Sequence, residues 1–244
     1  MESLTVLYAS PEAPTPSALQ DATGVPVVTG PRDLSRHAEQ ARTQDVPLVV
    51  IPAGTGRALT SVTQAAQALQ WARRSGTQVA LGPSLIDATR AVAEMRRHLR
   101  AAAASHDGVL FRANTVDPFA DAELLRRVRL AQQFSEDLLV EVTFEGSWPS
   151  PDSARERLRL LGATDVAEIR ADLGGRPGGG PDHGVPLFRA SSLATAVQRA
   201  SHTALHVLRD HHDDGIAVGL LADHATGFAH SHGDGHSHSH SHHH

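Results

Sequence analysis

The sequence predicts an α/β protein of two lobes, each a parallel sheet flanked by helices. Short β-branched runs alternate with longer helical patterns, which is typical of buried parallel strands joined by helical crossovers. The series restarts after residue 105, although no literal repeat is visible. Hydrophobic residues make up 40% of the chain and aromatic residues only 4%, so the expected core consists of Val, Leu, Ile and Ala.

The first lobe is predicted to span residues 1–104. Its strands are expected at Leu4–Tyr8, Val25–Val28, Leu48–Ile51 and Gln78–Leu81. Helical periodicity falls between them, at Leu34–Arg42, Ser61–Arg74 and Ser84–Ala104. Each strand run is short and each helical run longer, which is the pattern of β/α units.

The second lobe is predicted to span residues 105–222. Its strands are expected at Val109–Arg112, Leu138–Phe144, Asp165–Arg170 and, at the end, Gly215–Leu221. Its helices are expected from Pro118 to about Phe134, at Pro151–Leu161 and at Ser191–Arg209. Asp117 suits the cap and Pro118 the first turn of a helix, and Gly162 suits a helix end. The glycine-rich stretch Gly174–Gly184 is interpreted as a linker or surface loop.

Composition limits the partners. The formal net charge is -5 and no basic stretch dominates, so nucleic acid is not an expected partner. There is no Cys, which excludes disulfides, thiolate metal sites and a Cys nucleophile. The chain lacks both a run of about 20 apolar residues and a signal-peptide pattern, so we expect a cytoplasmic protein and no membrane partner.

The segment 223–244 is a histidine-rich tail that we expect to be disordered. Eight histidines fall between His230 and His244, mostly at every second position. Imidazole suits cobalt, nickel, zinc and copper, so the tail is predicted to bind metal. The expected ligands are His230, His232, His236, His238, His240 and His242. The alternative is an expression tag, although alternation with Ser and Gly favours a native segment. Such a tail fixes no geometry, which suits a store or delivery arm.

A second histidine group precedes the tail. His202 and His206 are four residues apart on an expected helix, and Asp210 continues the same face. This spacing is compatible with metal ligation. The alternative is a polar helix face whose cationic end is favoured by the helix dipole.

A glycine-containing turn follows the third expected strand. Gly54, Thr55 and Gly56 could cradle an anion such as a propionate or phosphate. The turn lacks the Lys of a P-loop and the glycine pattern of a dinucleotide site, and a plain turn is the alternative. Arg57 and Arg112 are expected near the carboxyl ends of strands, where open α/β sheets bind ligands. Both could instead be surface arginines.

Three segments in the middle of the chain carry a family resemblance. DGVLFRANTVDPFADAELLRRVRLA, at Asp107–Ala131, resembles the second-lobe motif of the small sirohydrochlorin cobaltochelatases and ferrochelatases. The matching positions are Asp117, Pro118, Ala122, Glu123 and Leu124. Val79–Leu85 and Val140–Val166 resemble further segments of that family, in the same order. The resemblance implies two lobes facing a cleft, in which a divalent ion is inserted into sirohydrochlorin without ATP.

The resemblance also implies site residues. Substrate contacts are expected from the turns after the strands, at Ser10, Gly54, Thr55, Gly56, Arg57, Arg112 and Asn114. The family's first strand usually ends in His-Gly-Ser, whereas this chain has Tyr8, Ala9 and Ser10, and no His follows its third strand. No catalytic histidine is carried over, so the catalytic residues expected in its place are Tyr8 and, in the glycine-rich loop, His183, with the His202/His206 pair as the alternative to His183. Tyr8 has an ordinary pKa near 10 and is a poor base unless shifted; packing at the sheet edge is its alternative role.

Three functions remain open, and the two leading ones both involve a divalent metal ion. The first is a chelatase that inserts a divalent ion, Co²⁺ before Fe²⁺ or Ni²⁺, into sirohydrochlorin or a related tetrapyrrole, with no organic cofactor. The second is a non-catalytic cobalt or nickel carrier on the same fold, and the third a structural partner of a true chelatase. The expected partners are a tetrapyrrole and, as one possibility, a second copy of the chain. A base within reach of the macrocycle favours the enzyme, and a cleft lined by Arg, Ser and Thr favours binding.

Overall fold

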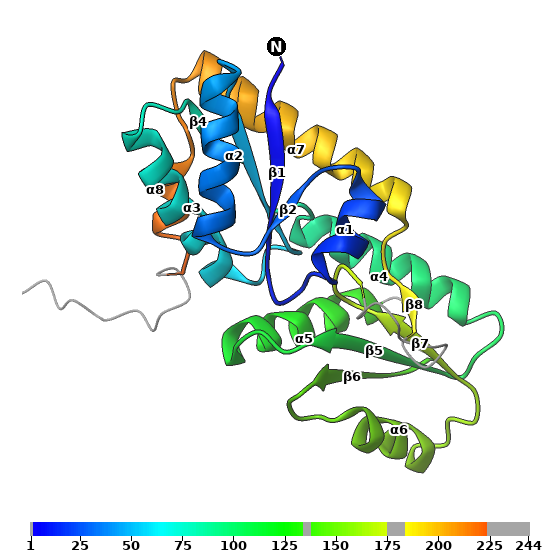
Figure 1. Cartoon of the computed structure of the whole chain (residues 1–244). Helices are drawn as coiled ribbons and strands as arrows, with labels where there is room; N and C mark the ends of the chain where they lie inside the picture. Colours follow the sequence, from blue (N-terminus) through cyan, green and yellow to red (C-terminus); the bar gives the residue numbers. More distant parts are fainter. Residues whose placement is uncertain (1, 134–137, 175–183, 224–244) are drawn as a thin grey trace, which may run out of the picture.

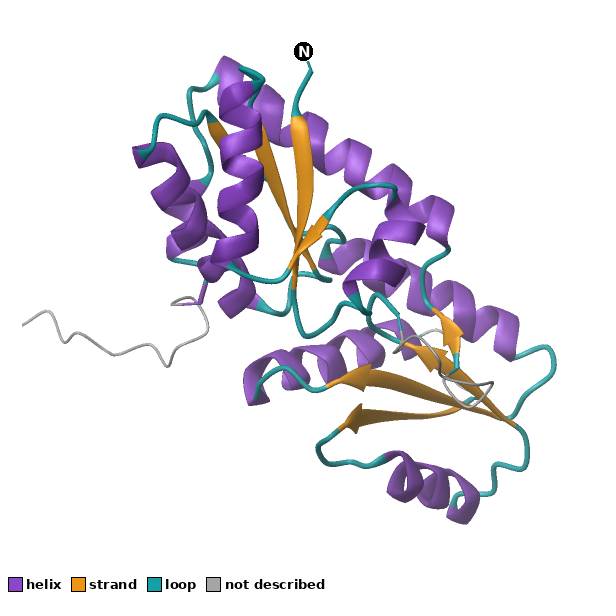
Figure 2. Cartoon of the chain, viewed as in Figure 1, coloured by secondary structure: helices purple, strands orange, loops and turns teal. Residues whose placement is uncertain are grey.

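The α/β architecture is confirmed by a computed structural model, which describes residues 2–133, 138–174 and 184–223. It contains two four-stranded sheets, and every strand pair in them is parallel. The two sheets share one topology, with strand orders β2-β1-β3-β4 and β6-β5-β7-β8. Figures 1 and 2 show the sheets as separate layers, each with helices beside it. The two lobes expected from the order of elements therefore repeat the same strand order.

The first sheet follows the expected strands closely. Its strands are β1 (Leu4–Ala9), β2 (Val27–Val28), β3 (Leu48–Ala53) and β4 (Val79–Leu81). The connecting helices are α1 (Pro16–Thr23), α2 (Pro31–Thr43) and α3 (Leu59–Arg74). Strand β3 is buried along its whole length, as its apolar run predicts. Helix α1 was not expected, because it is short and weakly apolar.

The second sheet consists of β5 (Gly108–Asn114), β6 (Leu139–Glu145), β7 (Val166–Arg170) and β8 (Val185–Pro186). Its helices are α5 (Pro118–Gln132) and α6 (Pro151–Leu160). The expected cap is present, since the Asp117 carboxylate accepts hydrogen bonds from the amides of Phe119 and Ala120. Gly162 has φ +104°, as a glycine after a helix end should.

Two long helices pack across the boundary near residue 105. Helix α4 (Ala88–Ala102) contacts α5 and β5 of the second sheet. Helix α7 (Ala190–Asp210) follows the second sheet but packs on β3, β4 and α1 of the first. One hydrophobic core runs through both lobes as a result, from Val49 in β3 to Phe111 in β5. The boundary therefore separates the sheets in sequence but not their covering helices.

The expected last strand at Gly215–Leu221 is wrong. Residues Ile216–Leu220 form a short helix, α8, which packs on α3 and β4. The helix packs closely here, since an added Cβ at Gly219 would lie 2.3 Å from Leu81 Cδ2 and 2.9 Å from Ala66 Cβ. An apolar run of this length does not distinguish a strand from a helical turn, and packing decides.

None of the helices in the described ranges is long and apolar enough to cross a membrane.

Candidate functional site: the groove between the lobes

The carboxyl ends of strands from both sheets meet where the lobes touch. Ser10 follows β1, Thr55 follows β3, and Asn114 ends β5. Asn114 reaches across, because its Nδ2 donates to the carbonyl of Pro11 at 2.9 Å. The turn residues expected to bind substrate are thus brought together, apart from Arg112.

A groove with two adjoining pockets lies at this junction. The pockets have volumes of about 460 and 400 Å³ and share Thr60 of α3 and Asp117 at the start of α5. The larger is also lined by Gly56, Arg57, Leu59, Phe119, Ala120, Ala122, Glu123, Arg126 and Arg127. The smaller is also lined by Ala9, Ser10, Pro11, Ser61, Gln64 and Val116. Two helices therefore begin at the groove, which places their N-terminal amides at its wall.

A buried carboxylate, that of Glu12, lies at the junction of the lobes. The Glu12 side chain has no exposed surface. It accepts hydrogen bonds from the Thr55 amide at 2.9 Å, from the Thr55 hydroxyl, and from Arg57 Nε at 3.0 Å. Gly54 allows this approach, because an added Cβ would lie 2.6 Å from Glu12 Oε2. The sequence did not single out Glu12, since a lone acidic residue in a loop gives no signal of a partner 43 positions away.

Arg57 joins the two lobes. Besides Glu12, it donates from Nη1 to Asp121 Oδ1 and from Nη2 to the Asn114 carbonyl, both at 2.9 Å. Its side chain is 0% exposed. The expected substrate contact by Arg57 is therefore corrected: its guanidinium is occupied by protein acceptors and closed to solvent.

Thr55 and Arg127 form a second link of the same kind. Arg127 Nη1 donates to the Thr55 carbonyl at 2.7 Å and to the Thr55 hydroxyl at 3.2 Å. Thr55 is 1% and Arg127 3% exposed, so the Thr55 hydroxyl is also closed to a ligand. Of the expected contacts, Ser10, Gly56 and Arg57 line the groove, although the Arg57 guanidinium is bonded to protein acceptors. The Ser10 hydroxyl donates to the Ala53 carbonyl at 2.6 Å.

Two arginines hold the Glu123 carboxylate of α5 as an anion. Hydrogen bonding by Arg126 is the largest influence on Glu123, and with Arg127 it lowers the pKa of Glu123 to about 2 against the opposing effect of burial. Asp117 uses its carboxylate as a helix cap. The low pKa of Glu123 makes it a poor proton acceptor near neutral pH.

The structure places the expected base Tyr8 in the core. Tyr8 is 2% exposed and packs with Val6 and Val50 in the hydrophobic cluster on the α3 side of the first sheet. Burial raises the pKa of Tyr8 above its ordinary value of 10.0. Tyr8 is therefore corrected from a catalytic candidate to a core residue. The other expected catalytic residue, His183, lies outside the described residues.

Arg112 lies away from the groove, on the α6 side of the second sheet. Its guanidinium donates to Glu145 at 2.7 and 3.1 Å and to Glu168 at 2.7 Å. Burial tends to raise the pKa of Glu168, but hydrogen bonds from Arg155 and Arg112 outweigh it and hold that pKa below its usual range. The expected contact of Arg112 with a ligand in the cleft is thus also corrected.

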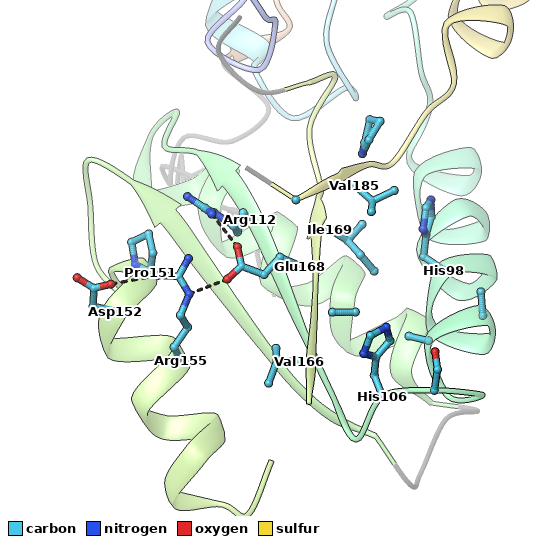
Figure 3. A pocket seen from close by; sticks show the side chains of 16 residues that line it. His98, His106, Arg112, Pro151, Asp152, Arg155, Val166, Glu168, Ile169 and Val185 are labelled. Atoms are coloured by element: carbon cyan, nitrogen blue, oxygen red, sulfur yellow. Dashed lines mark hydrogen bonds and ion pairs between the residues drawn. The ribbon is translucent and has the colours of Figure 1, made fainter. Parts of the chain in front are cut away.

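These charges line a further pocket, of about 1310 Å³, beside β7 and β8. Figure 3 shows Arg112, Glu168 and Arg155 on one side of the strand and His98 and His106 on the other. Each of the two imidazoles has a partner: His98 Nε2 lies 3.2 Å from the Leu187 carbonyl, and His106 Nδ1 lies 2.9 Å from Asp165 Oδ1. The polar groups of this pocket mainly satisfy one another.

The expected metal ligands are only partly described. His202 and His206 are exposed on α7, and His206 Nδ1 lies 2.5 Å from Asp210 Oδ2. The His206 ring meets the His211 ring edge to face at 5.9 Å. No group of three or more His, Cys, Asp or Glu side chains within residues 2–133, 138–174 and 184–223 is arranged to hold a metal ion. The tail histidines lie outside the described residues.

Comparisons with known proteins add little. No family model matches the chain, and no curated protein matches its sequence. Among solved structures, an ABC transporter solute binding protein from Clostridium phytofermentas with bound L-rhamnose is 12% identical, with a TM-score of 0.39. The alignment covers 88% of this chain and 84% of that protein.

Proposed function

We propose that the protein handles a divalent transition metal for a tetrapyrrole, as a chelatase of the sirohydrochlorin type that takes Co²⁺ before Fe²⁺ or Ni²⁺. In this proposal the histidine-rich tail collects the ion and the groove between the lobes receives the macrocycle. The reaction belongs to the cytoplasm. The observation that carries the proposal is the groove itself, at the carboxyl ends of two sheets of identical strand order.

The chemistry of the groove suits an anionic, partly apolar ligand. The start of α3, which has no side-chain cap, directs its helix dipole toward the groove and suits a carboxylate, whereas the Phe119 and Ala120 amides at the start of α5 are taken by Asp117. Arg126 is the exposed cation at the rim. Phe119, which is 50% exposed, offers an apolar face to a macrocycle.

A second function, a metal carrier without turnover, is favoured by a specific observation. Among the described residues that line the groove there is no imidazole, and Asp117 and Glu123 are both engaged by donors. Metal insertion releases two pyrrole protons, and these need an acceptor near neutral pH. If the protein is a chelatase, His183 is the candidate acceptor for these protons. A carrier needs no proton acceptor, because it does not insert the metal.

The test is cobalt insertion into sirohydrochlorin, followed by absorbance against the uncatalysed rate. The insertion rate is measured for the full chain, for the chain ending at Thr226, and for the His183→Ala variant of each. Acceleration that survives removal of the tail and is lost in His183→Ala supports the chelatase. Binding of sirohydrochlorin and Co²⁺ without acceleration supports the carrier, and failure to bind sirohydrochlorin contradicts both.

A further inference from the structure

The smaller pocket of the groove has two walls of different character. One wall is the first turn of α3 in the first lobe, and the other includes Asp117 at the start of α5 in the second lobe. The pocket has a volume of about 400 Å³, which lies in the lower part of the range of roughly 300–1,000 Å³ that is typical of small-molecule sites. A ligand held here would be small and would touch both lobes.

The α3 wall offers hydrogen-bond donors that the described part of the chain does not use. Helix α3 begins after Ala58 without a side-chain cap. The Leu59 amide donates to the Arg57 carbonyl at 3.0 Å, and the Ser61 amide donates to the Ala58 carbonyl at 3.1 Å. The Thr60 amide between them has no acceptor among the described residues. Together with the positive end of the helix dipole, this amide suits a negatively charged group.

The Ser61 side chain points independently to a ligand. Ser61 is only 6% exposed, and it lines the pocket. Its hydroxyl has no hydrogen-bond partner within residues 2–133, 138–174 and 184–223. Buried hydroxyl groups in proteins are normally hydrogen-bonded, because burial separates them from bulk water. The Ser61 hydroxyl is therefore available to donate to a ligand in this pocket.

The opposite wall carries a negative charge. Asp117 is the one charged side chain among the described residues that line the smaller pocket. Its Oδ1 accepts hydrogen bonds from the amides of Phe119 and Ala120, both at 2.9 Å, while its Oδ2 has no partner in the described ranges. A ligand that is only an anion would be repelled by this carboxylate. A ligand that is only a cation would leave the donors of α3 unused.

We infer that the smaller pocket binds a small zwitterion of the α-amino acid type, with its carboxylate on the Thr60 amide and the Ser61 hydroxyl and its ammonium on Asp117 Oδ2. An α-amino acid carries both charges near neutral pH, on groups attached to one carbon atom, and it can therefore satisfy both walls of one small pocket. The inference goes beyond the proposed function, since this ligand contains neither a metal nor a macrocycle.

The experiment is a titration of the ¹⁵N-labelled full chain, followed by the amide signals of Thr60, Ser61 and Phe119. The probes are L-alanine, L-serine, L-leucine and L-glutamate, whose side chains differ in size, polarity and charge. Acetate, methylammonium and glycerol are the comparison ligands, because they carry only the anion, only the cation or only hydroxyl groups.

Two substitutions separate the contributions of the two walls. Asp117→Asn keeps an oxygen for the cap of α5 but removes the negative charge, and Ser61→Ala removes the hydroxyl. The matched controls are Asp87→Asn and Ser35→Ala, at positions that line neither pocket of the groove. Asp87 is also a helix cap, since it accepts a hydrogen bond from the Arg90 amide at 2.7 Å, and Ser35 is exposed on α2. The spectrum of each variant also shows whether it is folded.

The inference predicts that at least one of the four amino acids binds about tenfold or more tightly than each comparison ligand. Asp117→Asn and Ser61→Ala should each weaken that binding about tenfold, because each removes a hydrogen bond to a charged group of the ligand. Both controls should bind like the natural chain.

Three results would overturn the inference. None of the four amino acids shifts the signals of the groove, a comparison ligand binds as tightly as they do, or Asp117→Asn binds as tightly as Asp87→Asn. No metal or tetrapyrrole is present in this titration. Its failure therefore leaves the proposed function untouched, and a failure of cobalt insertion leaves the amino acid site untouched.

Discussion

Buried charges at the junction of the lobes set the character of the groove residue by residue. Glu12 and Arg57 are both fully buried and are paired through Nε at 3.0 Å, and Arg57 continues to Asp121 in α5. Removing one partner from such a group leaves a charge without compensation in a site that water does not reach. These side chains link the two lobes beside the groove.

The substitution Arg57→Ala is expected to lower the free energy of unfolding by about 3–5 kcal/mol, because it strands the carboxylate of Glu12. Urea unfolding followed by circular dichroism measures the change. Arg42→Ala is the control, since Arg42 pairs with Glu39 on an exposed helix face, and it should leave the transition in place. A loss no larger than that of the control would show that the buried pair does not stabilise the junction.

Glu123 should give stability a dependence on pH. Its pKa is lowered from 4.5 to about 2 in the folded protein, mainly by hydrogen bonding to Arg126. The stabilisation is present above pH 4.5, where the unfolded chain is also ionised, and is lost as the pH falls from 4.5 toward 2. Glu123→Gln should therefore lose less stability than the natural chain between pH 5 and pH 3, measured by urea midpoints. Parallel losses in both would contradict the assignment.

The residues at the groove show how far sequence reasoning reaches. Ser10 and Gly56 could be placed at the carboxyl edge of the first sheet and Asn114 at that of the second, because each lies at or just after the end of a strand and parallel strands end at a common edge. The roles of Tyr8, Arg57 and Arg112 could not be assigned, because they depend on partners distant in sequence. Arg57, for example, finds Glu12 45 positions earlier and Asp121 64 positions later.

At the scale of elements, the ends of α3 and α5 define the groove. Asp117 and Pro118 begin α5 as the sequence predicts, because capping and the first helical turn depend on neighbouring residues. The helical conformation of residues 216–220 could not be predicted in this way, because the segment packs against Leu81 and Ala66, which are distant in sequence. Local chemistry therefore gives helix starts, whereas tertiary packing decides short apolar runs.

The cap of α5 can be tested by exchanging its acceptor. Asp117→Ala removes the acceptor of the Phe119 and Ala120 amides and should cost about 1 kcal/mol of stability. Asp117→Asn keeps an acceptor oxygen and should recover most of that loss. Thermal and urea unfolding of the three chains provide the comparison. If Asn is as destabilising as Ala, the carboxylate charge matters at this position and capping does not.

At the scale of the whole molecule, two long helices join the two similar sheets, because each packs on the sheet of the other lobe. Helix α4 covers the second sheet and α7 returns to the first, so a single core runs through both. The order of elements predicted two lobes, but sequence periodicity cannot say which sheet a helix will cover. The shared core keeps the two sheet edges facing one groove, which is the feature that the proposed function needs.

The most direct test of that function is titration of the tail-deleted chain with sirohydrochlorin, comparing Thr60→Trp with Gln67→Trp. Thr60 is exposed and lines both pockets of the groove, whereas Gln67 is exposed on the same helix and lines neither. If the groove receives the macrocycle, Thr60→Trp weakens binding about tenfold or more, which corresponds to about 1.4 kcal/mol of binding free energy. Gln67→Trp then binds sirohydrochlorin like the natural chain. Equal binding by both variants would place the tetrapyrrole elsewhere and contradict the proposed function at its centre.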